Sequence, residues 1–179
     1  MKRVIVFLGW MLAGITTVSA QDYTRVYKVA NRTAFDIYVL AAEFVAGRNF
    51  TYSKDPVNNS VEIDVVIPYT GSSSDCMAGL DLNGKLFLQA KDGKTRIIMD
   101  SITYTQHKLQ VADTPVIMAA ALHTNDTACA ASGQVEALYK CAACSQRTDK
   151  VKAALQSYFD QLADSYRDYM KSEILTSGL

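Results

Sequence analysis

The hydrophobic positions of the chain recur at two spacings, one of which predicts strands and the other helices. The stretch SVEIDVVIPY, residues 60–69, alternates apolar and polar side chains and has the clearest strand pattern. One face would carry Val61, Ile63, Val65, Ile67 and Tyr69. Glu62 and Asp64 would occupy the other face. One buried face and one water-facing side are typical of an antiparallel sheet.

Four further strands are expected from shorter patterns. The first covers Tyr23–Val29, which is rich in β-branched and aromatic residues. NFTYSKD, residues 49–55, predicts a short second strand. Residues 84–90 and 95–104 predict two more, joined by KDGK. The Asp92-Gly93 pair in this connection is a strong signal for a hairpin turn.

Two other segments have helical spacing. In the first, Thr33 and Asp36 form a near capping box, and Gly47 marks the expected end. Its apolar stripe comprises Ala34, Ile37, Tyr38, Ala41, Phe44 and Val45. The second helix covers residues 149–175 and should lie across the sheet. Its tyrosine-rich stripe comprises Val151, Leu155, Tyr158, Leu162, Tyr166, Tyr169 and Ile174.

These elements predict an α+β fold, with an antiparallel sheet of about five strands and helices on one face. The expected order is strand, helix, four strands, an excursion and a long helix. The excursion, residues 107–148, is irregular, with short helix expected at Pro115–Leu122 or Gln134–Lys140. Residues 21–179 are expected to form a single domain, of which residues 21–106 are the core.

Residues 1–20 have the pattern of a secretory signal peptide. Lys2 and Arg3 precede an apolar run over residues 4–15, and small residues end the segment before Gln21. This run is shorter than the roughly 20 residues that span a bilayer. We therefore expect an exported protein without a transmembrane segment. Removing the two basic residues changes the net charge from 0 to −2. Such a charge argues against a nucleic-acid partner, since nucleic-acid binders carry basic patches.

Two stretches resemble a family of exported Bacteroidetes-type proteins, a domain of unknown function with a TBP-like fold. The first is IYVLAAEFV, residues 37–45, where Tyr38, Ala41 and Glu43 match the family and Phe44 stands where the family usually has Trp. The second is KDGKTRIIMDSITY, residues 91–104. The resemblance covers residues 22–106 approximately and implies a TBP-like or helix-grip-like sheet. It implies no activity, because none is established for the family. It also implies a periplasmic or cell-surface location.

The four cysteines are Cys76, Cys129, Cys141 and Cys144. In an exported protein they favour two structural disulfides, which would hold the excursion in place. We expect Cys129 to bond one member of the Cys141–Cys144 pair and Cys76 to bond the other. Two alternatives remain open. A redox dithiol would use Cys141 and Cys144. A Cys₃His zinc site would use Cys129, Cys141, Cys144 and His123, although only one short-spaced ligand pair is present.

No other motif indicates chemistry: the chain has no nucleophile motif and no phosphate-binding glycine loop. We expect no catalytic residue, no cofactor and no metal. Tyr158, Tyr166 and Tyr169 are candidates for lining a ligand groove, although a packed stripe is the more common use of such residues. The sequence therefore predicts a non-enzymatic binding or accessory module. Its partner would be a protein, a glycan or a small apolar ligand. The alternative is a thiol-disulfide oxidoreductase using Cys141 and Cys144.

Overall fold

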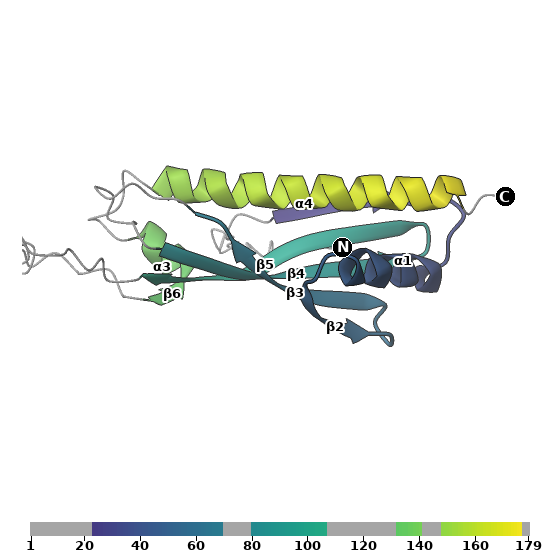
Figure 1. The fold of residues 1–179 in the computed structure, drawn as a ribbon, viewed down its shortest axis with the longest axis horizontal. Helices are drawn as coiled ribbons and strands as arrows, with labels where there is room; N and C mark the ends of the chain where they lie inside the picture. The colour runs from purple at the N-terminus through teal and green to yellow at the C-terminus, as the bar shows by residue number, and fades with distance from the viewer. Residues whose placement is uncertain (1–22, 70–79, 107–131, 141–147, 177–179) are drawn as a thin grey trace, which may run out of the picture.

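The computed structural model describes residues 23–69, 80–106, 132–140 and 148–176. The strands are β1 (Tyr23–Lys28), β2 (Thr51–Asp55), β3 (Ser60–Ile67), β4 (Leu80–Lys91), β5 (Lys94–Gln106) and β6 (Ser132–Gln134). The helices are α1 (Ala34–Ala46), α3 (Val135–Tyr139) and α4 (Thr148–Thr176). The long helix α4 runs along the length of the molecule beside the sheet (Figure 1).

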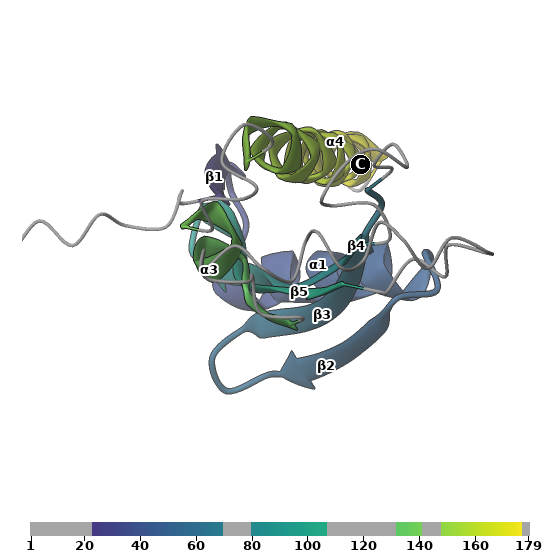
Figure 2. The same ribbon diagram turned by 90° about the vertical axis from the view of Figure 1, so that its left-hand side faces the viewer.

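The strands form one antiparallel sheet in the order β1-β5-β4-β3-β2. The short strand β6 pairs with β5 at Thr103–Thr105, past the segment of β5 that β1 occupies. The sheet curves from β1, which lies close to α4, round to β2 on the far side (Figure 2). The predicted α+β class is confirmed, with six strands in place of five. β6 was not predicted, because Ser-Gly-Gln has no strand pattern.

The core lies between the two long helices and one face of the sheet. Val61, Ile63, Val65 and Ile67 of β3 are at most 2% exposed, as their alternation predicted. Val66, between them, is 72% exposed and lies on the opposite face. Phe44 of α1 and Ile97 of β5 are fully buried in the same cluster. This face of the sheet, covered by α1 and α4, is called the inner face below, and the opposite one is the open face.

The hairpin between β4 and β5 also fixes the start of α1. The predicted capping box forms, with the Thr33 hydroxyl accepting from the Asp36 N–H and the Asp36 carboxylate accepting from the Thr33 N–H. From the hairpin, Asp92 Oδ1 accepts from the Ala34 N–H at 2.7 Å. Gly93 has a φ of 70°, which favours glycine, and donates its N–H to the Arg32 carbonyl at 3.0 Å. The turn and the helix therefore support each other.

Replacing Thr33 with alanine should destabilise the protein by about 1 kcal/mol, the usual cost of losing an N-cap side chain. The hydrogen bonds from Thr33 hold the pKa of Asp36 below its ordinary value. The cap is therefore fully effective above the ordinary carboxyl pKa and is lost as pH falls through the lowered one. Urea unfolding at pH 7 and at pH 3 would measure both effects. An unchanged midpoint at pH 7 would contradict this view of the cap.

The buried face of α4 differs from the predicted stripe. It comprises Val151, Leu155, Phe159, Ala163, Tyr166 and Met170. Tyr158, Leu162 and Tyr169 are only partly buried and lie at the margin of the core. Neighbouring residues on a helix point about 100° apart. Because the predicted stripe contained Tyr158 in place of Phe159, the predicted buried face was rotated relative to the observed one. No helix in the described parts of the chain is long and apolar enough to cross a membrane.

The excursion is described only over residues 132–140 and at Thr148, the first residue of α4. The helix α3 lies within the predicted Gln134–Lys140 segment and buries Val135 and Leu138. The other predicted short helix, at Pro115–Leu122, lies outside the described residues, as do residues 1–20.

Candidate functional site

Tyr166, one of the three candidate groove tyrosines, lies inside the core. Its side chain is fully buried, and its ring meets that of Phe44 edge-on with a centroid separation of 5.0 Å. Its hydroxyl lies 2.8 Å from the Thr95 hydroxyl, which itself donates to the Gln89 carbonyl. Tyr166 is therefore the donor to Thr95. Burial raises the pKa of Tyr166.

Tyr158 and Tyr169 lie at the edge of the same core. The Tyr169 ring is 5.5 Å from that of Phe44, and burial raises the pKa of both tyrosines. A pocket of about 220 Å³ lies between β1 and the second half of α4. Its lining comprises Val26, Tyr27, Lys28, Val29, Arg167, Met170, Lys171 and Ile174, and none of the three tyrosines. Their role in ligand binding stays a prediction.

All four cysteines and both histidines lie outside the described residues. The disulfide, redox and zinc interpretations of Cys76, Cys129, Cys141 and Cys144 therefore stay predictions. In the described part of the chain, no three His, Cys, Asp or Glu side chains come together in a group that could hold a metal ion.

The open face of the sheet carries three lysines in one row across three strands. Lys94 of β5 lies directly opposite Lys28 of β1 on one side and opposite Lys91 of β4 on the other. All three are exposed. Like charges directly opposite each other in a sheet are destabilising. The row is therefore an electrostatic cost to the fold, which a bound anion would relieve.

None of the three lysines forms an ion pair within the described residues. The ion pairs there involve Arg25, Lys85 and Arg167. The carboxylate of Asp92, in the turn between Lys91 and Lys94, offsets part of this charge, and it also accepts from the N–H of Ala34 at the start of α1.

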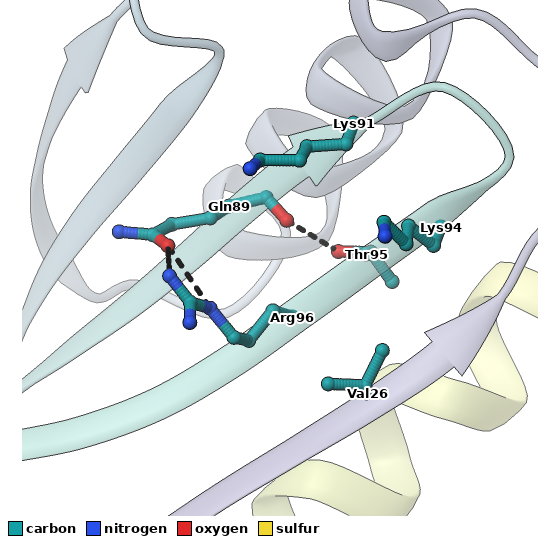
Figure 3. A pocket seen from close by; sticks show the side chains of 6 residues that line it. All are labelled: Val26, Gln89, Lys91, Lys94, Thr95 and Arg96. Atoms are coloured by element: carbon teal, nitrogen blue, oxygen red, sulfur yellow. Dashed lines mark hydrogen bonds between the residues drawn. The ribbon is translucent and has the colours of Figure 1, made fainter. Parts of the chain in front are cut away.

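A pocket of about 160 Å³ adjoins this row. Its lining comprises Val26, Gln89, Lys91, Lys94, Thr95 and Arg96 (Figure 3). Arg96 is held against β4 because its Nε and Nη2 both donate to Gln89 Oε1. Val26 adds an apolar side chain that is 58% exposed. The pocket thus combines fixed cations with a small apolar surface.

The rest of the open face has the opposite charge. Lys85 is paired there with Glu62. Beyond this pair the exposed side chains include Asp64, Asp81 and Asp100. Phe87 and Ile98 are half-buried between the two regions. The cations of this face are therefore concentrated at the hairpin end, over β1, β5 and β4.

This arrangement can hold an anionic group. Ammonium and guanidinium groups donate charge-assisted hydrogen bonds to carboxylate, phosphate or sulfate. The backbone of three paired strands fixes the positions of their Cα atoms, so a small anion would meet several donors at once. We call Lys28, Lys91, Lys94 and Arg96 the cationic cluster.

Sequence analysis missed the cationic cluster. Part of the signal was present in KDGK, because a two-residue hairpin turn places Lys91 and Lys94 opposite each other. Alternation then places Arg96 on the same face as Lys94. Lys28 could not be added without knowing that β1 pairs with β5 in this register.

Comparison with known proteins defines the fold more closely. No family model and no curated protein match the chain. Among solved structures, a TBP-like protein from Parabacteroides distasonis has a TM-score of 0.60 at 10% identity, covering 84% of this chain and 92% of its own. A DUF4468 family protein from Bacteroides ovatus has a TM-score of 0.56 at 10% identity, covering 83% and 85%.

The protein therefore has a TBP-like fold, as the resemblance implied. The neighbours are Bacteroidetes proteins whose descriptions give no activity, which is consistent with a domain of unknown function. At this identity the likeness shows the fold alone, so function has to be argued from the residues of this chain.

Proposed function

We propose that the protein is an exported, non-enzymatic binding module of the periplasm or cell surface that holds an anionic group of its partner in the cationic cluster. The observation that carries this proposal is the row of Lys28, Lys94 and Lys91 across three neighbouring strands. Export is supported by the signal-peptide pattern of residues 1–20.

Binding is favoured over catalysis by the chemistry of the pocket. Its lining provides cations, one amide, one buried hydroxyl and an apolar side chain, without a base positioned to activate a nucleophile. The Thr95 hydroxyl is used inside the fold, since it bonds to Gln89 and Tyr166. The remaining groups can bind and orient an anion, and none of them is set up to transfer a proton.

Neutralising two of the lysines should weaken binding of a small anion. For the double variant Lys91→Gln with Lys94→Gln, we expect the affinity for inorganic phosphate to fall about tenfold, since an exposed charge pair contributes roughly 0.2–1 kcal/mol and two together contribute about 1.4 kcal/mol. The affinity of each protein for phosphate would be measured by following its amide shifts in an NMR titration. Raising the salt concentration should weaken wild-type binding as well, because exposed charges are screened.

Lys54→Gln is the matched control. Lys54 is also an exposed strand lysine, but it lies on β2 beside the ring of Tyr52, at the other edge of the sheet. The control should bind phosphate like the wild type. Equal weakening by the control and by the double variant would mean that only net charge matters, and the proposed site would be wrong.

The oxidoreductase alternative concerns residues outside the described parts of the chain. Alkylation of the purified, unreduced protein followed by intact mass measurement separates the two functions. Cys141 and Cys144 reacting as free, low-pKa thiols would favour the oxidoreductase, whereas two disulfides would favour the binding module.

A further inference from the structure

The outer edge of β1 is open to another strand. β1 is the first strand in the sheet order, and no described strand pairs with its outer side. The Val29 N–H donates toward β5, to the carbonyl of Gly93 at 2.9 Å. Alternate residues of a strand direct their backbone groups to opposite sides, so Thr24, Val26 and Lys28 present theirs at the outer edge. Consistent with this, the Thr24 carbonyl accepts from the Arg25 side chain rather than from β5.

The two pockets lie on the two faces of this edge. The pocket of about 160 Å³ is on the open face, and the pocket of about 220 Å³ is on the inner face against α4. Val26 lines both of them. A strand added beside β1 would direct alternate side chains to the two faces. The inner-face set would lie beside the pocket against α4. The open-face set would lie beside Val26 and Lys28 of β1, with Lys94 and Arg96 of β5 two strand spacings away, about 10 Å, and Lys91 of β4 three spacings away.

The two pockets differ in chemistry. The open-face pocket has Lys91, Lys94 and Arg96 in its wall. The inner-face pocket has the apolar side chains of Val29, Met170 and Ile174 in its wall. Its lining also includes Lys28, Lys171 and Arg167, and Arg167 is paired with Asp164 and Asp168. Acidic side chains on one face of an added strand and apolar side chains on the other would match both.

We infer that the β1 edge binds an extended segment of a partner protein as an additional strand, with acidic side chains in the cationic cluster and apolar side chains against α4. This inference rests on the proposed function and adds the class of partner to it. Strand addition of this kind gains affinity from main-chain hydrogen bonds and specificity from the alternating side chains.

Charge favours a peptide over two other partners. A nucleic acid lying across the open face would also meet Asp64, Asp81 and Asp100, which would repel its phosphates. A second copy of this chain pairing through β1 would bring Arg25 and Lys28 of its own β1, and no acidic side chain of that strand, to this edge. A short acidic strand confined to the β1 edge avoids both conflicts.

The test uses the synthetic peptide acetyl-Glu-Val-Glu-Val-Glu-Val-Glu-amide and the whole secreted chain. Val26→Pro removes an outward N–H and leaves the β1–β5 hydrogen bonds intact, since proline is tolerated at a solvent-facing edge position. Val26→Ala is the matched control, because it removes side-chain atoms and keeps the N–H. We expect Val26→Pro to weaken peptide binding about tenfold or more, because it removes a main-chain hydrogen bond to the peptide. Val26→Ala should weaken peptide binding less, because it removes only side-chain contacts.

The outcomes separate the two claims. If Val26→Pro binds the peptide like the wild type and Lys91→Gln with Lys94→Gln does not, strand addition is wrong and the anion site stands. If the lysine variant also binds inorganic phosphate like the wild type, the proposed function is wrong too. Failure of the wild type to bind the peptide, tighter binding of a DNA duplex, or dimerisation that Val26→Pro abolishes would each overturn the inference.

Discussion

Replacing Val65 with aspartate should leave the protein largely unfolded at 25 °C. Val65 is 2% exposed and lies in the middle of β3, within the core that both long helices cover. Its neighbours on this face are apolar and offer a carboxylate no partner. Burying an unpaired charge costs several kcal/mol, a large part of the roughly 5–15 kcal/mol that stabilises a typical domain. Circular dichroism would show loss of the cooperative thermal transition.

The adjacent residue supplies the control. Val66 is 72% exposed on the open face, so Val66→Asp introduces the same charge one position along without burying it. This variant should melt close to the wild type, since surface substitutions usually change stability by no more than about 0.5 kcal/mol. If the two variants exchanged their behaviour, the faces of β3 would be reversed.

Truncating Tyr166 to alanine should destabilise the protein by about 3–5 kcal/mol, the range for removing a buried aromatic side chain. The substitution removes the ring that packs against Phe44 and the hydroxyl that bonds to Thr95. Tyr158→Ala, at the margin of the core, should cost less. Urea unfolding measures both. A Tyr166→Ala variant of unchanged stability would mean that this tyrosine is not part of the core, and would favour its predicted role in a ligand groove.

Tyr166→Phe separates the ring from the hydroxyl. It should cost about 1 kcal/mol, the net contribution of one hydrogen bond. Tyr166→Phe should also change how the stability of the protein falls at alkaline pH. Burial raises the pKa of Tyr166 above its ordinary value of 10.0. The stability that the neutral Tyr166 side chain contributes to the fold is therefore complete below pH 10.0, and it is lost as pH rises toward the folded-state pKa. The wild type should therefore lose stability above about pH 10 more steeply than Tyr166→Phe does. Equal pH profiles would contradict this assignment.

Elements with a strong local signal were predicted correctly. The alternation of β3 identified its buried face because one side of an antiparallel sheet meets the core and the other meets water. The capping box of α1 and the Asp92-Gly93 turn formed where their residues predicted. In the capping box and the turn, the contacts that decide the conformation lie within a few residues, so the sequence alone contains them. In β3 the alternation itself indicates which side chains are buried.

Elements that depend on distant contacts were missed or displaced. The stripe of α4 is wide, and only its packing against α1 and β1 decides that Phe159 and Met170 face inward. The strand β6 is defined by its pairing with β5, where Gly133 lies opposite Tyr104, about 30 positions earlier in the chain. Placing Lys28 in the cationic cluster required the register between β1 and β5. The same register was required to recognise Val26 as an edge residue beside two pockets.

The most direct test of the cationic cluster is a map of amide shifts in the ¹H–¹⁵N NMR spectrum as the wild-type protein is titrated with inorganic phosphate. The binding site proposed here predicts that the largest shifts fall on Lys28, Lys91, Lys94 and Arg96. Shifts should be small on β2 and on Asp64 and Asp81 of the acidic region. Largest shifts outside β1 and the β4–β5 hairpin, or no saturable shifts at all, would contradict the proposal that this cluster is the site at which the protein binds its partner.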